Sequence, residues 1–496
     1  MAIEFGKNNL TISVGAATGA PLSTIKAPVE FFKPDNAPSS ALEFDPTKFL
    51  HLLSTTAERA IGAADISPTE ISGIGVTSQR QGLVLLDLAG QPLYVGPYRD
   101  MRASKEGAEI DANALVDLWE LTGHAPGVTS GWARLQWFVS NKPEIYDRTR
   151  TACSIADWII LELTGELLLE ETLAVESGFG MVATGDPTNV LTQAYNLGDI
   201  QLPATCSPGT IVGKLKKAYA DPLGIDTNTP VVACGPDTQS GLIGLGTYQS
   251  NEIGIISGWN TSCMRITELP VFDDTRAMLT GRHVIRNRWV LEGNAGDTGA
   301  TYQWLLSLIY GSLDNVEVMK SIDDPLGRIE PGSTGVNAFL GPSLVHSANI
   351  TERMGGLMFP IPATNDPPDR FDIARSALDS FAFAIRYNIE RLNSFRGPAA
   401  NISFGGGMAK TETFRTILAN VLDCEIRVAE SGETTNLGTF SQVAASIGSG
   451  PSVSEIASER ALELVKHEPD PSHSAIYDGL YSEWRHKERM IGNIEQ

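Results

Sequence analysis

The segment that most constrains the fold is an apolar strand that stops at a glycine, a proline and an acid. Residues 230–237 read PVVACGPD, and the small residues of SGLIGLG follow from Ser240. The β-branched run predicts a buried strand, and the Gly-Pro pair predicts a sharp turn before a helix. Because ligands of α/β sheets bind beyond strand carboxyl ends, Asp237 stands where a general base would be useful. The alternative, that Asp237 only caps the following helix, stays open on this stretch alone.

The rest of the chain alternates between strand and helix patterns, which is typical of the α/β class. Two strands around a polar turn are predicted in residues 73–93, and a strand pair through a Gly/Asn turn in residues 252–267. A strand, a glycine loop and a helix are predicted in residues 401–423. Apolar residues at helical spacing predict further helices in residues 114–123, 133–141, 156–165, 296–311 and 377–395.

One short motif occurs twice. Gly6-Lys7-Asn8 leads into a strand near the start, and Gly258-Trp259-Asn260 does the same in the second half of the chain. Both are predicted to form hairpins at the start of a lobe, which indicates a duplicated chain of two lobes. Coincidence between two short strings is the alternative explanation.

Two other stretches are candidates for ligand binding. Gly405-Gly406-Gly407 separates a strand from a helix, where backbone can approach an anionic group, although a plain tight turn also explains it. It lacks the Walker A ending. Gln79-Arg80-Gln81-Gly82 lies in the turn of a predicted apolar hairpin, and Tyr98-Arg99-Asp100-Met101-Arg102 follows soon after. Such side chains can hold hydroxyl groups through charge-assisted hydrogen bonds, with an ordinary surface ion pair as the alternative.

Charge and cysteine usage exclude several classes of protein. The chain has 37 Lys and Arg residues against 59 Asp and Glu residues, a formal net charge of −22. This argues against a nucleic-acid partner, which needs a basic face. No secretory signal or membrane-length apolar run is present, so no membrane partner is expected. The five cysteines form no zinc or CxxC spacing, which predicts reduced thiols and a cytoplasmic location.

In this order, six segments resemble the FGGY carbohydrate kinase family over nearly the whole chain. They are TSQRQGLVLLDLAGQPL with YRDMRAS, PVVACGPDTQSGLIGLG, GATYQWL, FGGGMAKTETFRTILANVLD, TTNLGTFSQVAA and AIYDGLYSEWRHKER. The resemblance implies an α/β fold of two actin-like (ribonuclease H-like) ATPase lobes with a central cleft. Residues 1–245 would form the N-terminal lobe with the acceptor site and the base. Residues 246–496 would form the C-terminal lobe with the nucleotide site and a helical tail.

The same resemblance implies a kinase that transfers a phosphoryl group from ATP to a hydroxyl of a small sugar, ketose or polyol, with Mg²⁺ as cofactor. Asp237 would be the general base, and Asp237 and Glu4 would be metal ligands. The residues implied to bind the acceptor are Arg80, Gln81, Asp100, Arg102 and Gln239. Those implied to bind the nucleotide are Gly6, Asn8, Thr261, Gly299, Gln303, Gly405, Gly406 and Asn436. Glu171 falls where some members present a substrate-side acid, and a homodimer is also implied.

Both predicted phosphate turns depart from the family pattern. Members usually open with Asp-x-Gly-Thr-(Thr/Ser), whereas the matching residues here are Glu4, Gly6, Lys7, Asn8 and Asn9. The second turn reads Asn260-Thr261-Ser262 in place of Gly-Thr-(Ser/Gly). These changes motivate an alternative, a non-catalytic or regulatory actin-like pseudokinase that binds nucleotide or sugar without transfer. Retention of the acid at Asp237 favours transfer.

Overall fold

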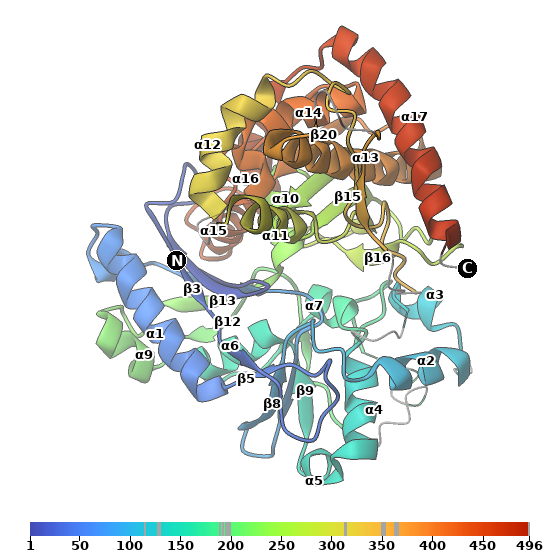
Figure 1. The fold of residues 1–496 in the computed structure, drawn as a ribbon. Coiled ribbons are helices and arrows are strands. Elements are labelled where there is room, and N and C mark those ends of the chain that lie inside the picture. Colours follow the sequence, from blue (N-terminus) through green and yellow to red (C-terminus); the bar gives the residue numbers. More distant parts are fainter. Residues whose placement is uncertain are drawn as a thin grey trace. The chain divides into compact units, whose positions relative to one another are not determined.

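The computed structural model, drawn as a ribbon in Figure 1, describes residues 1–113, 116–125, 130–187, 190, 193, 200–311, 315–348, 354–361 and 367–494. The chain divides into two compact units. The first comprises Met1–Tyr248, Thr267–Leu291 and Thr434–Arg460, and the second comprises Gln249–Ile266, Glu292–Glu433 and Ala461–Gln496. The lobe boundary at residues 245 and 246 stays a prediction. Each unit is described by itself below.

The first unit is built on a six-stranded sheet in the order β12-β13-β6-β1-β2-β3. These strands are β1 (Ala2–Phe5), β2 (Asn9–Val14), β3 (Ser23–Pro28), β6 (Ile74–Ser78), β12 (Thr210–Lys214) and β13 (Pro230–Pro236). The three central strands β1, β6 and β13 run parallel, and the outer pairs are antiparallel. Phe5 and Pro236 both lie opposite Ser78, so these three strands end at one edge of the sheet.

Further elements complete the first unit. Its short strands are β4 (Phe31–Phe32), β5 (Glu43–Phe44), β7 (Leu83–Leu86), β8 (Pro92–Gly96), β9 (Thr151–Cys153), β10 (Leu169–Glu170), β11 (Thr205–Cys206) and β16 (Leu279–Arg282). Its helices include α1 (Pro46–Ala63), α2 (Ser104–Asn113), α3 (Leu118–Thr122), α4 (Gly131–Asn141), α5 (Pro143–Tyr146), α6 (Ile155–Thr164), α7 (Glu171–Glu176), α9 (Lys217–Leu223), α10 (Asp237–Gly244) and α15 (Thr434–Ser446). The helices predicted in residues 133–141 and 156–165 are thereby confirmed.

The hairpin predicted in residues 73–93 is wrong in one respect. Both strands form, but β6 belongs to the six-stranded sheet, whereas β7 belongs to a separate sheet in the order β8-β7-β9. Every residue of β6 and of β7 is buried, as is usual for strands covered on both faces. Without an exposed face, the apolar pattern does not specify which strands pair. The turn at residues 79–82 therefore connects two sheets.

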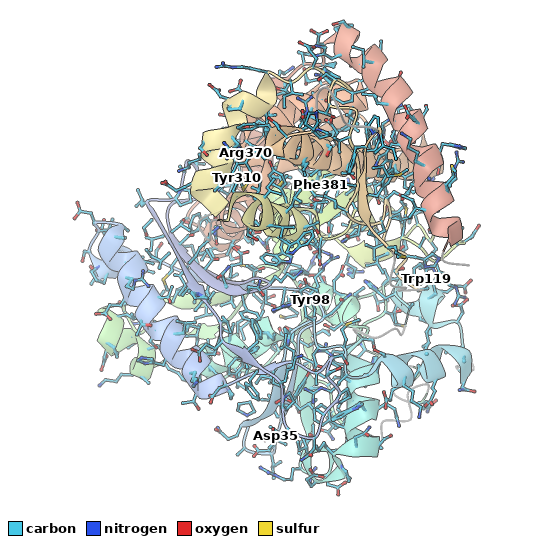
Figure 2. The ribbon with its side chains drawn as sticks, in the orientation of Figure 1. Asp35, Tyr98, Trp119, Tyr310, Arg370 and Phe381 are labelled. Atoms are coloured by element: carbon cyan, nitrogen blue, oxygen red, sulfur yellow. The ribbon has the colours of Figure 1, made fainter. Side chains whose placement is uncertain are left out.

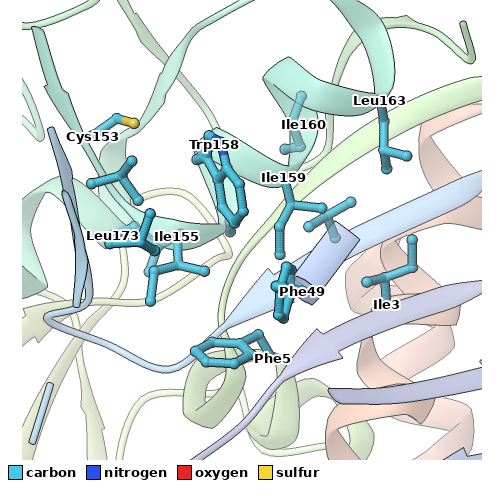
Figure 3. Packing of buried hydrophobic residues seen from close by; sticks show 14 of the residues in the cluster. Ile3, Phe5, Phe49, Cys153, Ile155, Trp158, Ile159, Ile160, Leu163 and Leu173 are labelled. Carbon is cyan, nitrogen blue, oxygen red and sulfur yellow. The ribbon is translucent and has the colours of Figure 1, made fainter. Parts of the chain in front are cut away.

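Alternating residues of β1 pack on the two faces of the sheet. Ile3 and Phe5 lie in the main core cluster, where the ring of Phe5 is 5.3 Å from that of Phe49 in α1 (Figure 3). Trp158 of α6 lies beside Phe49, with ring centroids 5.6 Å apart. On the other face Ala2 packs against Leu437 and Phe440 of α15. The sheet is thus covered by α1 and α6 on one face and by α15 on the other.

The second unit repeats this arrangement of strands. Its strands include β14 (Glu252–Ser257), β20 (Asn401–Gly405), β21 (Ile426–Val428) and β22 (Val465–His467), whereas β15 (Thr261–Thr267) and β17 (Trp289–Asn294) each cross a unit boundary. These strands are neighbours in the order β17-β15-β14-β20-β21-β22. An antiparallel hairpin is followed by two parallel strands and an antiparallel outer strand, as in the first unit. The duplication predicted from the two Gly-x-Asn motifs is therefore visible in the strand order of both units.

Helices of the second unit agree with the helical patterns of the sequence. They include α11 (Thr298–Tyr310), α12 (Asn315–Gly327), α13 (Arg370–Arg396), α14 (Glu412–Leu422) and α17 (Pro471–Ile494), while α16 (Val453–Glu463) spans a unit boundary. A short hairpin is formed by β18 (Asn337–Phe339) and β19 (Gly356–Met358). The guanidinium of Arg370 lies over the ring of Tyr310 at 5.1 Å, which joins the start of α13 to the end of α11 (Figure 2).

Candidate active site

Three loops of the first unit follow strands that end at the same edge of its sheet. The turn at Gly6 follows β1, the turn at residues 79–82 follows β6, and Asp237 follows β13. The hydroxyl of Thr77 donates to the carbonyl oxygen of Gly235 at 2.7 Å, which ties β6 to the end of β13. The carboxyl edge of a parallel sheet is where ligands of α/β proteins bind. Three sequence-predicted segments therefore meet at one edge.

Asp237 is the first residue of α10. The N-cap position belongs to Pro236, and Oδ1 of Asp237 accepts from the backbone N–H of Thr238 at 2.8 Å. A capping side chain stands before the helix and accepts from the second or third helical N–H group, so the cap interpretation is wrong. Gly235 has φ +72°, and a Cβ there would lie 2.7 Å from Oγ1 of Thr172. This glycine turn positions the half-buried Asp237 at the strand end.

A buried carboxylate of α7 binds three polar side chains of the first unit. Oε2 of Glu176, the last residue of α7, lies 3.2 Å from Nη1 of Arg80 and 3.2 Å from Nε2 of His124. Oε1 of Glu176 accepts from Nε2 of Gln239 at 2.7 Å. Burial opposes the charge on Glu176, but Arg80 and His124 outweigh it and lower its pKa to about 2. We call Arg80, His124, Glu176 and Gln239 the Glu176 cluster.

Sequence reasoning found two of these four residues. Arg80 and Gln239 were predicted to bind the acceptor, and the structure brings both to the same carboxylate. His124 and Glu176 were missed, because a single histidine in a loop after a helix and a single acid in an apolar helical string have no diagnostic spacing. The acid singled out from that string, Glu171, lies instead 3.7 Å from Nη2 of Arg282. Glu176 is five positions further along the same helix.

Asp100 and Arg102 are enclosed within the first unit. Oδ2 of Asp100 accepts from Nε of Arg102 at 2.7 Å and from the hydroxyl of Tyr94 at 2.5 Å. Nη2 of Arg102 donates to Glu43 at 2.6 Å, and its guanidinium lies 4.9 Å from the ring centroid of Trp137. The side chains of Asp100 and Arg102 are 0% and 2% exposed. These contacts stabilise the loop after β8 from the interior of the unit.

Gln81 occupies a strained position in the turn that carries Arg80. Its φ is +62°, in the left-handed region that non-glycine residues rarely adopt. Its carbonyl oxygen accepts from Nη2 of Arg134, a fully buried residue of α4 that also donates to the carbonyl oxygen of Pro97 at 3.0 Å. Arg134 therefore joins the turn at residues 79–82 to the loop after β8. Backbone strain of this kind persists only where surrounding contacts hold it.

The first predicted phosphate turn is hydrogen-bonded to the turn at residues 79–82 and to the loop after β8. The carbonyl oxygen of Gly6 accepts from Nε2 of Gln79 at 3.3 Å, and Oδ1 of Asn8 accepts from Nη2 of Arg99 at 2.5 Å. Nζ of Lys7 lies 5.8 Å from the ring centroid of Tyr98. Glu4 is half-buried in β1 opposite Thr77. A Cβ at Gly6 would make only ordinary contacts, so sterics do not demand glycine there.

The second predicted phosphate turn lies in the second unit, between β14 and β15. Oγ1 of Thr261 lies 2.5 Å from Oγ of Ser257 and 2.6 Å from Oγ1 of Thr298. Thr298 and Gly299 open α11, and a Cβ at Gly299 would lie 2.0 Å from the carbonyl oxygen of Gly258. Only glycine permits this approach of helix to turn. A helix N-terminus placed here favours an anionic group.

The glycine loop of the second unit also requires its glycine. Gly406 follows β20 with φ +98°, and a Cβ there would lie 2.6 Å from the carbonyl oxygen of Ser257. The loop continues into a 3₁₀ turn at Gly407–Lys410. Nζ of Lys410 donates to Glu433 at 2.9 Å. Gly405 ends β20 opposite Ile256, so the predicted glycines lie beside the end of β14.

Gln303 and Asn436 differ in their surroundings. Gln303 is exposed on α11. Asn436 is fully buried in the first turn of α15, and within the described residues neither its Oδ1 nor its Nδ2 has a hydrogen-bond partner. Unpaired buried amides are rare and call for an explanation such as a ligand. Asn436 belongs to the first unit, whereas Thr261, Gly299, Gln303, Gly405 and Gly406 belong to the second.

Two properties of the described residues bear on metal ions and membranes. Among the described residues, no group of three or more His, Cys, Asp or Glu side chains could hold a metal ion. None of the described helices combines the length and the apolar character that crossing a membrane requires.

Comparison with known proteins places the chain in a family. Family models for the N-terminal and C-terminal domains of the FGGY family of carbohydrate kinases match residues 3–244 and 257–446. An autoinducer-2 kinase of Salmonella paratyphi A is 25% identical, covering 98% of this chain and 93% of that protein. The xylulose kinase of Rhodospirillum rubrum has a TM-score of 0.80 at 19% identity, covering 99% of this chain and 98% of that one. Plasmodium falciparum glycerol kinase, solved with ADP, has a TM-score of 0.82 at 19% identity, covering 99% and 97%. The fold is therefore the two-domain, actin-like α/β fold of these enzymes, and the chain belongs to the FGGY family of carbohydrate kinases.

Proposed function

We propose that this chain transfers the γ-phosphoryl group of ATP to a hydroxyl of a small sugar, ketose or polyol. The observation that carries the proposal is the placement of Asp237 at the carboxyl end of β13, in the same helix as a residue of the Glu176 cluster. A carboxylate at that position can accept the proton of the attacking hydroxyl, while neighbouring donors orient the acceptor. The family match and the kinase names of the relatives support transfer, and neither supports the pseudokinase alternative.

The residues are proposed to serve either the acceptor or the nucleotide. Arg80 and Gln239, with His124 and Glu176, form the acceptor site. Gln81, Asp100 and Arg102 are proposed to shape that site through the loops they hold, since Asp100 and Arg102 are enclosed by protein. The nucleotide is assigned to the turns and loops that carry Gly6, Asn8, Thr261, Gly299, Gln303, Gly405, Gly406 and Asn436.

Mg²⁺ is proposed to enter with the nucleotide. The described residues offer no cage of three ligands, which suits a metal held mainly by phosphate oxygens and one or two carboxylates. Glu4 lies one residue before the end of β1 and Asp237 directly follows β13, at the same edge of the sheet, so these two carboxylates fit that pattern. When bound, Mg²⁺ would neutralise charge on the phosphates. We also expect a cytoplasmic location, because all five cysteines are free. The implied homodimer stays a prediction, which the molar mass from light scattering would test.

Acceptor-dependent ADP release from ATP, measured over pentuloses, hexuloses, polyols and linear dihydroxy-ketones, tests the proposal. Asp237→Asn should lower turnover by roughly 10²–10⁴-fold, as expected for loss of a general base, and leave the affinity for metal-free nucleotide nearly unchanged. Asp221→Asn, an exposed position on α9, is the matched control and should retain activity. Absence of ADP release with every acceptor, or full turnover in Asp237→Asn, would overturn the proposal.

A further inference from the structure

The contacts of the Glu176 cluster also bear on which acceptors the site can bind. Its carboxylate accepts from side chains of three separate segments: Arg80 after β6, His124 after α3 and Gln239 in α10. The side chain of Glu176 is 2% exposed. A Cβ at Gly281 of β16 would lie 2.3 Å from Oε1, so a larger residue there would have to displace this carboxylate. The cluster is therefore a built feature of the first unit.

The cluster already supplies Arg80 with a counter-charge. A guanidinium in an acceptor site is the usual partner of a substrate carboxylate, because the two groups form paired, charge-assisted hydrogen bonds. Here Nη1 of Arg80 faces the internal carboxylate of Glu176 at 3.2 Å. Since Glu176 stays ionised, a second carboxylate brought to Arg80 would meet a like charge in a buried setting.

Hydroxyl groups face no such penalty. A guanidinium only donates hydrogen bonds, and a neutral hydroxyl that accepts from it brings no second negative charge beside Glu176. Gln239 is held in place at both ends, since its Oε1 accepts from the hydroxyl of Thr238 at 2.6 Å and its Nε2 donates to Glu176. Asp237 stands two residues before Gln239 in the same helix. A neutral hydroxyl bound at this cluster therefore meets no like charge, in contrast to a carboxylate.

We propose that Glu176 makes the acceptor site selective for uncharged sugars and polyols and against sugar acids. This inference rests on the proposed function, because it concerns the acceptor of the same reaction. Glu176 acts through Arg80, His124 and Gln239 and is therefore a positioning residue. Specificity can arise from a group that repels the wrong substrate, and here the carboxylate of Glu176 would repel the carboxylate of a sugar acid.

The test compares acceptors matched in carbon number, xylitol with xylonate and glucitol with gluconate. In the wild type we expect kcat/KM for the neutral member to exceed that for the acid by about 100-fold or more, as for like charges brought together in a binding site. Glu176→Gln should raise the acid-to-neutral ratio of kcat/KM by roughly 10-fold or more. Glu171→Gln removes the same charge from the same helix outside the cluster, and it should leave the ratio unchanged.

The wild-type ratio decides the inference even if Glu176→Gln does not fold. Equal use of acids and neutral acceptors by the wild type, or an unchanged ratio in a folded Glu176→Gln protein, would overturn it. If no acceptor of either kind supports ADP release, the proposed function fails. Calorimetric binding of xylitol and xylonate to both proteins then tests the inference independently: preference for xylitol in the wild type, relaxed in the variant, supports it, and any other pattern overturns it.

Discussion

Nη2 of Arg99 donates a hydrogen bond to Oδ1 of Asn8 at 2.5 Å, joining the loop after β8 to the turn after β1. Gln79 strengthens the junction, because its Nε2 donates to the carbonyl oxygen of Gly6 and its Oε1 accepts from the N–H of Tyr98 at 3.2 Å. The family pattern has hydroxyl residues in this turn, and their replacement by amides gives Arg99 an acceptor. The first predicted phosphate turn is therefore held by the loop that also carries Asp100.

Removal of this contact should affect catalysis through position. We expect Arg99→Ala and Asn8→Ala each to lower kcat/KM for ATP by about 10-fold, since small displacements of a binding turn are costly. The double variant should lose no more than either single variant, because both remove one contact. Arg148→Ala, an exposed arginine after α5, is the control and should keep full activity. Additive losses in the double variant would show that the two residues act separately.

A second prediction concerns two glycines between α10 and α15. A Cβ at Gly438 would lie 1.7 Å from the carbonyl oxygen of Ser240, and one at Gly244 would lie 1.9 Å from that of Thr434. Gly438→Ala must push the helices apart, which we expect to lower the free energy of unfolding by about 1–3 kcal/mol. Activity should fall as well, because α10 begins at Asp237.

Gly479→Ala is the matched control for this crossing. Gly479 is exposed in α17, and a Cβ there would meet no atom within 4 Å. Replacement by alanine in an open helical position stabilises a protein by about 0.5–1 kcal/mol. Denaturant titration of both variants should therefore give shifts of opposite sign. A Gly438→Ala protein as stable as the wild type would contradict the close crossing.

The sequence predicted element types well where the pattern is periodic or punctuated. The glycine turn before Asp237 and the helical spacing of residues 377–395 both led to correct elements, because local sterics and burial determine them. The prediction that the strands before and after residues 79–82 pair with each other was wrong, because a strand buried on both faces does not specify its partner. The burial of Arg102 beneath Trp137 depends on tertiary packing, which no spacing reveals. Glu176 was missed for the same reason.

A third prediction follows from the ion pair between His124 and Glu176. Burial alone would lower the pKa of His124, but the charge of Glu176 and its hydrogen bond raise it above 6.5. The protonated histidine then contributes stability that is fully present below pH 6.5 and is lost as pH rises through the raised pKa. Glu176, with a pKa of about 2 instead of 4.5, contributes stability above pH 4.5 that is lost toward pH 2. The pair is therefore strongest between about pH 4.5 and 6.5.

His124→Gln should consequently cost more stability at pH 5.5 than at pH 8.5. Thermal unfolding of variant and wild type at the two pH values gives the comparison directly. His51→Gln, at an exposed position of α1, should change the midpoint little at either pH. A difference between wild type and His124→Gln that is equal at both pH values would argue against a charged pair.

The last prediction concerns the five thiols. Cys153, Cys234 and Cys263 are fully buried, and burial raises the pKa of each thiol. Cys206 is 9% exposed, and Cys424 is half-buried with a pKa raised to about 11. The thiolate is the reactive form of a cysteine. In the native protein at pH 8, at most about one equivalent of thiol should therefore react with Ellman's reagent, and this reaction should be slow. That equivalent should disappear in Cys424→Ser, whereas all five thiols of the wild type should react in guanidinium. Rapid labelling of Cys234 in the native protein would show that the strand leading to Asp237 opens, against its placement inside the sheet between β12 and β6.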